Sequence, residues 1–261
     1  MASVEREGAR LHYEVHGDGP ALVLAHGAGG NALSWWQQVP VLAREFRVVR
    51  FDHRGFGRSS CPPEGVHPRH FVADLEAILA AEKIGDVALV CQSMGGWTGL
   101  PFALAHPGRV RALALCGTPG GFVTERLRRE LPVLAERVRT HGVAEMALGP
   151  CFRREEPALA FLYQQLNDLN PPGTAVAMAS RLFEVIVREE QLEGWRTPTL
   201  VIAGGDDAFF APAVMEDLAA RIPGARLHAM PRIGHSTYFE APEEFNRVVL
   251  DFLRAHARAP G

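Results

Sequence analysis

One serine stands where its side chain could act as a nucleophile. Residues 87–92 read Val-Ala-Leu-Val-Cys-Gln, an apolar run that predicts a strand buried on both faces. Ser93 follows at once, and Gly95, Gly96 and a helix-compatible run to about Ala105 come after it. A serine on a sharp turn between a strand and a helix lies beside free backbone N–H groups, which stabilise developing negative charge. The alternative is that Ser93 only caps a helix, a role that serine fills well.

A serine hydroxyl is a weak nucleophile at neutral pH and needs a neighbouring base. His235, after Gly234, is the candidate, because imidazole can take the proton and later return it to the leaving group. A histidine in a loop can also be an ordinary surface residue. The imidazole needs a carboxylate to orient it, and Asp207 in the loop after a predicted strand fits this role. Asp206 is its competitor.

The elements that carry these residues follow from hydrophobic patterning. Alternating side chains at residues 9–16 predict an edge strand exposed on one side. Apolar runs predict buried strands at 21–25, 87–92 and 199–203, and further strands are predicted at 47–51, 110–116 and 226–230. Helices are predicted between them and at the end, at about 33–45, 71–83, 96–105, 213–221 and 242–257. This alternation predicts a mostly parallel sheet covered on both faces. His26, Asp52, Ser93, Asp207 and His235 each lie just after a predicted strand, at the edge where such sheets bind ligands.

Residues 120–195 break the alternation. They contain no convincing strand, and helical patterns at 127–141, 143–148, 157–169 and 174–187 are separated by Pro150, Pro171 and Pro172. We interpret this stretch as a helical lid inserted into the core. The predicted organisation is therefore a core in two parts, residues 1–119 and 196–261, with a cap at 120–195.

Composition excludes several other classes. The chain has 261 residues, 47% of them hydrophobic and 22% charged, with a net charge of −3. Nothing favours nucleic acid or an anionic membrane as a partner. The four cysteines form no C-x-x-C pair, and we expect free thiols and no metal site. The N-terminus lacks the apolar core of a signal peptide and no run approaches the ~20 apolar residues of a membrane span, so we expect a cytoplasmic protein.

The order of these motifs resembles the α/β-hydrolase fold superfamily, in its serine-nucleophile branch with a helical cap. The matching pieces are His26-Gly27, Asp52-x-Arg54-Gly55-x-Gly57-x-Ser59, Ser93-Met94-Gly95-Gly96, Gly204-x-x-Asp207 and Gly234-His235. The resemblance implies an α/β fold with a roughly eight-stranded, mostly parallel sheet flanked by helices, and an inserted helical lid. It also favours Asp207 over Asp206. One position departs from the pattern, because Cys91 stands where the family usually has glycine.

The resemblance implies an oxyanion hole and a substrate pocket. The donors would be the backbone N–H groups of Met94 and Ala28, with Gly29 as a fallback for Ala28. One such donor is typically worth ~10²–10³-fold in rate. Gly29, Trp97 and Phe122 are candidate substrate-binding residues, although core packing is an equally good explanation of the two aromatic side chains.

Together these features predict a serine hydrolase that cleaves a carboxylic ester or a lactone through an acyl-serine intermediate. The substrate would be a small molecule with an apolar acyl part, no cofactor is needed, and the oligomeric state stays open. One alternative is hydrolysis of a carbon–carbon bond in a vinylogous diketone, for which Arg181 or Arg188 could bind a substrate carboxylate. The other is a non-catalytic ligand-binding relative, since a fold alone does not fix a function.

Overall fold

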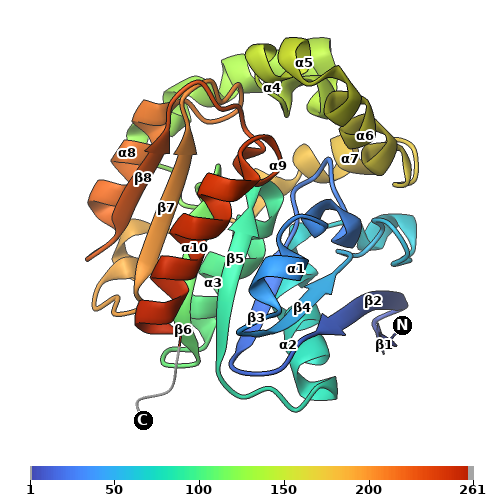
Figure 1. The fold of residues 1–261 in the computed structure, drawn as a ribbon, viewed down its shortest axis with the longest axis vertical. Helices are drawn as coiled ribbons and strands as arrows, with labels where there is room; N and C mark the ends of the chain where they lie inside the picture. The colour runs from blue at the N-terminus through green and yellow to red at the C-terminus, as the bar shows by residue number, and fades with distance from the viewer. Residues whose placement is uncertain (1, 258–261) are drawn as a thin grey trace.

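The computed structural model describes residues 2–257, and within them one eight-stranded sheet forms the centre of the molecule (Figure 1). Its strand order is β1-β2-β4-β3-β5-β6-β7-β8. β1 and β2 pair antiparallel, as do β2 and β4, and the remaining neighbours are parallel. The bounds are Ala2–Arg6, Ala9–His16, Ala21–Ala25, Arg47–Phe51, Val87–Gln92, Val110–Cys116, Thr199–Gly204 and Arg226–Met230. The predicted fold class is confirmed.

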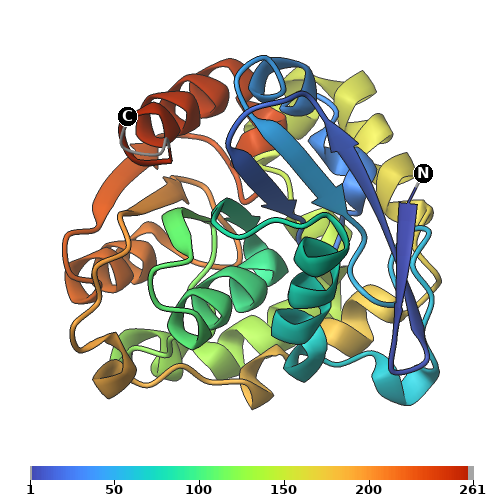
Figure 2. The ribbon, with the colours of Figure 1, turned by 90° about the horizontal axis from the view of Figure 1, so that it is seen from below.

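The first strand was not predicted, and it corrects the assignment of the edge. β2 was expected at the edge of the sheet, but β1 lies outside it, beside the N-terminus (Figure 2). Glu7 and Gly8, with φ of 46° and 74°, form the tight turn between the two strands. β1 alternates between half-buried and exposed side chains, so it lacks the apolar run that marks the central strands.

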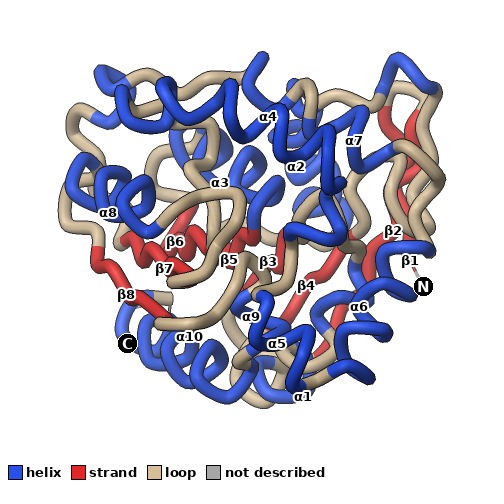
Figure 3. The backbone as a smooth tube through the Cα atoms, turned by 90° about the horizontal axis from the view of Figure 1, so that it is seen from above, coloured by secondary structure: helices blue, strands red, loops and turns tan. Residues whose placement is uncertain are grey.

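Helices cover both faces of the sheet (Figure 3). On one face lie α2 (Phe71–Ala81), α3 (Gly96–Ala105) and α8 (Pro212–Arg221), and on the other lie α1 (Val39–Leu42) and α10 (Pro242–His256). β5 serves both cores, because Leu89 and Cys91 point into one while Ala88 and Val90 point into the other. This is why its sequence is apolar at successive positions rather than at alternate ones.

One predicted helix is broken. Residues 33–45 were expected to form a continuous helix, but they form a short 3₁₀ turn at Ala32–Trp35 and then the single turn of α1. Pro40 lies in the first turn of α1. Proline is tolerated there, but it cannot donate the backbone hydrogen bond that would continue a helix from the preceding turn.

In the helical segment, residues 120–195, the helices lie across the carboxyl ends of the central strands (Figure 1), and residues 191–195 return to the amino ends of β6 and β7. It contains α4 (Glu125–Met146), α5 (Pro150–Glu155), α6 (Pro157–Asp168) and α7 (Thr174–Ala179). α4 is interrupted at Gly142, whose φ of 76° and ψ of 162° are not helical, as the predicted division after residue 141 requires. α5 was not predicted, and α7 ends eight residues before the expected boundary at 187. Among the described residues, no helix is long and apolar enough to span a membrane.

Candidate active site

Ser93 lies on the turn between β5 and α3 with a backbone φ of 48°, a left-handed conformation that a non-glycine residue rarely adopts. The two glycines after it permit the close packing of this turn. A Cβ on Gly95 would lie 2.2 Å from the carbonyl oxygen of Ala25, and one on Gly96 would lie 2.2 Å from Oγ1 of Thr118. The local geometry therefore matches the sharp strand–turn–helix arrangement that the sequence predicts.

Cys91 is accommodated by a glycine on the neighbouring helix. Its side chain is fully buried, and a Cβ on Gly99 would lie only 2.4 Å from its Sγ. The absence of a side chain at residue 99 thus makes the space that the thiol occupies. Burial raises the pKa of the Cys91 thiol, which stays protonated and apolar in its contacts.

The structure brings His235 and Asp207 together. Nδ1 of His235 donates a hydrogen bond to Oδ2 of Asp207 at 2.8 Å, and both side chains are buried. The second oxygen, Oδ1, accepts from the backbone N–H groups of Phe209 at 2.7 Å and Phe210 at 3.0 Å. Asp206, the competing acid, is exposed. This arrangement fixes the imidazole tautomer so that Nε2 is free to accept a proton.

His235 lies beside the turn that carries Ser93. Nε2 of Gln92, the residue before the serine, donates to the carbonyl oxygen of His235 at 3.5 Å. A Cβ on Gly117 would lie 3.2 Å from Nδ1 of His235, and Gly117 follows Cys116, the partner of Gln92 in the sheet. Within residues 2–257, Nε2 of His235 is buried and has no hydrogen-bond partner. The hydrogen bond between a catalytic base and its nucleophile is often long before substrate binds. Nε2 of His235 is therefore available to the serine hydroxyl.

The loop after β3 lies against the other side of Ser93. A Cβ on Gly27 would lie 3.0 Å from Cβ of Ser93. Nδ1 of His26 donates to the carbonyl oxygen of Gly27 at 2.8 Å, while its Nε2 accepts from the backbone N–H of His53 at 3.0 Å. Burial lowers the pKa of His26, which favours the neutral ring that these two bonds require. His26 therefore shapes the loop. Ala28, which follows Gly27, is buried, and so is Met94, which follows Ser93 on the turn.

Of the three candidate substrate-binding residues, Phe122 belongs to the helical segment, and Trp97 and Gly29 lie against it. Trp97 is 1% exposed, and its Nε1 donates to the carbonyl oxygen of Val185 at 3.1 Å. Phe122 is 2% exposed and belongs to the same core cluster. A Cβ on Gly29 would lie 3.5 Å from Oη of Tyr163 on α6, so this glycine faces the helical segment directly.

Sequence reasoning missed three polar residues around His235. Ser236 donates from its Oγ to Oη of Tyr163 at 3.0 Å, and Glu240 accepts a hydrogen bond from the backbone N–H of Gly234 at 2.9 Å. The sequence carries one usable signal, an acid at 240 inside the otherwise apolar run Tyr-Phe-Glu-Ala-Pro. An acid in such a setting is unusual enough to suggest a specific partner.

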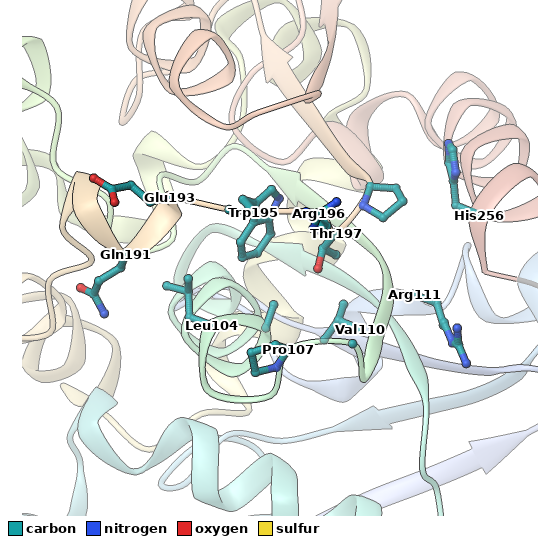
Figure 4. A pocket seen from close by; sticks show the side chains of 14 residues that line it. Leu104, Pro107, Val110, Arg111, Gln191, Glu193, Trp195, Arg196, Thr197 and His256 are labelled. Atoms are coloured by element: carbon teal, nitrogen blue, oxygen red, sulfur yellow. The ribbon is translucent and has the colours of Figure 1, made fainter.

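A hollow of about 590 Å³ lies elsewhere, at the amino ends of β6 and β7 (Figure 4). Leu104, Val110 and Trp195 contribute apolar walls, and Arg111 and Glu193 lie at its rim. Ser93, Asp207 and His235 are not among its lining residues. This hollow is therefore separate from the loops that carry Ser93, Asp207 and His235.

Known proteins resemble this chain in sequence over most of its length. The sequence model of the alpha/beta hydrolase fold matches residues 20–242. A putative carbamate hydrolase RutD from Caulobacter sp. (strain K31) is 32% identical, over 95% of this chain and 97% of that protein. A 2-hydroxy-6-oxononadienedioate/2-hydroxy-6-oxononatrienedioate hydrolase from Burkholderia vietnamiensis is also 32% identical, over 94% of this chain and 91% of the relative.

A solved structure is also similar to this chain. The enol-lactonase from Burkholderia xenovorans LB400 superposes with a TM-score of 0.80 at 26% identity, covering 97% of this chain and all (100%) of that one. The match of the family model to most of the chain, the eight-stranded sheet and the hydrolase relatives lead to one conclusion. The chain belongs to the α/β hydrolase fold family of enzymes.

Proposed function

We propose that this protein hydrolyses carboxylic esters or lactones through an acyl-serine intermediate on Ser93. One observation carries the proposal: Asp207 holds Nδ1 of His235, so that the buried Nε2 is left as an unpaired acceptor beside the strained turn of Ser93. A histidine held in this way is a base that is ready to accept the serine proton.

The reaction follows from these positions. Oγ of Ser93 bonds to the acyl carbon while Nε2 of His235 takes the hydroxyl proton, and the carbonyl electron pair moves onto oxygen. The backbone N–H groups of Met94 and Ala28 stabilise this oxyanion. Collapse expels the alcohol, which takes the proton from His235, and the same base then activates the water that releases the acid. A lactone is a cyclic ester, so it opens by the same steps.

The helical segment acts as the cap over this site. It is anchored to the loops around Ser93 by hydrogen bonds from Nδ2 of Asn31 to the carbonyl oxygen of Leu166 at 2.7 Å and from Nδ2 of Asn170 to that of Gly30 at 3.2 Å. Trp97 and Phe122 wall the acyl pocket beneath it. Because both are almost fully buried, the substrate reaches them when the helical segment shifts.

Carbon–carbon bond hydrolysis is the second candidate, and the relative from Burkholderia vietnamiensis, named for a dioate substrate, favours it. That reaction would need cations directed at the substrate carboxylates. Of the two arginines suggested by sequence, Arg181 donates to the carbonyl oxygen of Val66 at 2.9 Å, and the side chain of Arg188 is 75% exposed. Neither arginine therefore supports a carboxylate subsite beside Ser93, and ester or lactone cleavage is the better supported function.

Turnover of a matched substrate panel tests the proposal. p-Nitrophenyl esters of increasing acyl length, simple lactones, p-nitrophenyl carbamates and dienoic diketones would be compared at equal enzyme concentration. We expect esters or lactones to give the highest kcat/KM, and Ser93→Ala to abolish the activity. A preference for the diketones would select the second candidate, and no turnover of any member would favour a non-catalytic relative.

A further inference from the structure

A second buried carboxylate lies next to the histidine loop. Glu240, the last residue of α9 (Thr237–Glu240), is 9% exposed. Its Oε2 accepts from the backbone N–H of Gly234 at 2.9 Å, and its Oε1 accepts from that of Gly149 at 3.2 Å. Gly234 directly precedes His235, whereas Gly149 belongs to the helical segment, between α4 and α5. One side chain thus bonds the histidine loop and the helical segment at the same time.

The two glycine backbones around this carboxylate are in close contact. A Cβ on Gly234 would lie 2.2 Å from the nitrogen of Gly149 and 2.6 Å from Oε1 of Glu240. A Cβ on Gly149 would lie 3.0 Å from Oε2 of Glu240. A side chain at either glycine would push the helical segment away or displace the carboxylate. Such a close approach of two backbones requires glycine.

The position of Glu240 is costly for stability. Its hydrogen bonds come from two backbone amides, and no arginine, lysine or histidine of residues 2–257 lies at ion-pair distance from it. Burial raises the pKa of this carboxyl to about 7, although the two amides act in the opposite direction. A buried acid without a cation costs free energy relative to an apolar residue, so its presence suggests a role other than stability.

A second pair of contacts joins the same two parts of the molecule. The backbone N–H of Ser236 donates to the carbonyl oxygen of Ala147 at 3.0 Å, and Oγ of Ser236 donates to Oη of Tyr163 at 3.0 Å. Both neighbours of His235 are therefore connected to the helical segment. Gly234 is connected through Glu240, and Ser236 is bonded directly. The placement of its imidazole depends on how that segment is seated.

We propose that Glu240 is a positioning residue, whose carboxylate clamps the His235 loop to Gly149 of the helical segment and so holds the imidazole toward Ser93. The proposal rests on the proposed function of Ser93 and His235. His235 can then act as a base only while the helical segment is bound to its loop. If the segment moves away, the bonds of Glu240 to Gly149 and of Ser236 to Ala147 are broken, and the residues on both sides of His235 lose their support. Substrate binding under the segment and activation of the serine are then linked.

Glu240→Gln is the test variant. It keeps the shape and one acceptor oxygen, but its amide nitrogen must face one of the two N–H donors. We expect kcat and the second-order rate of fluorophosphonate labelling to fall about 10- to 100-fold, with KM changed less than about threefold, since small displacements of a catalytic group have effects of this size. Hydrogen exchange should become faster at the amide of Gly149 or of Gly234, whichever faces the new NH2 group, because that amide loses its acceptor.

Asp74→Asn is the matched control. Asp74 is a buried carboxylate on α2 that accepts from Nε and Nη2 of Arg54 at 2.6 and 2.5 Å, and neither residue contacts the histidine loop. This variant should lower Tm while the labelling rate and kcat of the folded protein stay within about twofold of wild type. A loss of rate in Glu240→Gln but not in Asp74→Asn separates positioning of His235 from general destabilisation.

Tyr163→Phe provides a second variant if Glu240→Gln fails to fold. It removes the contact with Ser236 and should lower the labelling rate about three- to tenfold. Wild-type labelling rates in Glu240→Gln, or in Tyr163→Phe where the first variant does not fold, would overturn the inference. Failure of the wild-type protein to react with fluorophosphonate would overturn the proposed function instead, and hydrogen exchange at Gly149 and Gly234 would still show whether the clamp exists.

Discussion

The two edges of the central sheet differ in what they present to solvent. At the carboxyl edge, Asp207 and His235 are bonded to each other beside the turn that carries Ser93, in a largely buried region. At the amino edge, a hollow of about 590 Å³ is open, and two of the side chains that line it have their polar groups paired. Nε1 of Trp195 donates to Oγ1 of Thr199 at 3.0 Å, and Arg111 pairs with Asp86.

This difference teaches that open volume and chemical competence are separate properties. In parallel sheets, strands end with their carbonyl groups and loops at one edge, and that edge collects the side chains that act on ligands. At the carboxyl edge, Nε2 of His235 is a buried acceptor without a partner among the described residues, and such a costly atom calls for an explanation. The amino edge has no comparable atom among the described residues.

Ser93→Ala is expected to have the largest effect on kcat. A small effect would contradict the assignment of the chemistry to the carboxyl edge of the sheet. Loss of the proposed nucleophile should lower kcat about 10⁵- to 10⁶-fold, the size of effect known for serine hydrolases. Thermal unfolding should change little, because the hydroxyl of this residue makes no hydrogen bond among the described residues. Steady-state kinetics on the best ester of the panel, with a circular dichroism melt, measures both.

Asp207→Asn should follow, with a loss of about 10⁴-fold in kcat, because an amide at this position favours the wrong tautomer of His235. Asp206→Asn is its neighbouring control. Asp206 is exposed, so its variant should stay within about twofold of wild type. Equal losses in the two variants would mean that the hydrogen bond from His235 to Asp207 does not orient the base.

Gly99→Ala should destabilise the carboxyl edge by about 1–3 kcal/mol, because its Cβ would overlap Sγ of Cys91. Adding Cys91→Ala should restore most of the loss, since the clash disappears with the thiol. Urea unfolding of wild type, both single variants and the double variant measures the coupling. Additive effects would contradict the account of how this chain accepts cysteine at residue 91.

Glu240 is expected to make the free energy of unfolding depend on pH, with a smaller effect than the substitutions above. Its pKa is raised from 4.5 to about 7 in the folded protein, so the folded state binds more protons than the unfolded chain between these values. Its contribution to stability is thus present below pH 4.5 and is lost as pH rises to about 7. His235, Asp207, Tyr163 and Tyr238 are the titratable groups that face it, and they are common to both variants compared.

The free energy of unfolding of wild type relative to Glu240→Gln should therefore decrease from pH 4.5 to pH 7 and then level off. Urea titrations at several pH values check the sign. A difference that increases with pH would show that Glu240 is stabilised as a carboxylate, contrary to the burial that dominates its environment.

The smallest effects are expected at the amino edge. Gln191 and Glu193 line the hollow in Figure 4 and are exposed. Gln191→Ala and Glu193→Ala should change kcat/KM less than about twofold and stability by less than about 0.5 kcal/mol. A clear loss of turnover in either variant would assign this edge a part in the reaction.

The sequence predicted the central strands because their apolar runs are local signals. Residues 47–51 and 110–116 have the expected bounds, since side chains buried on both faces leave no ambiguity of period. β1 was missed because it is half-exposed. The helix expected at residues 33–45 is interrupted between Trp35 and Val39, just before Pro40, which cannot donate a hydrogen bond to the preceding turn.

The site divides in the same way. Ser93, Asp207 and His235 each follow a strand, which is visible in the sequence. The bond between Glu240 and Gly149 joins residues 91 positions apart, and no local pattern can predict such a contact. Gly99 likewise explains Cys91 only once α3 is packed on β5. Contacts that depend on the position of the helical segment could not be predicted from local sequence patterns.

Reaction with a fluorophosphonate, followed by peptide mass spectrometry, tests the central claim most directly. The account predicts one covalent adduct, on the peptide that contains Ser93, absent from Ser93→Ala and formed far more slowly in Asp207→Asn. No adduct on the folded wild-type protein, or an adduct of equal yield on Ser93→Ala, would contradict it.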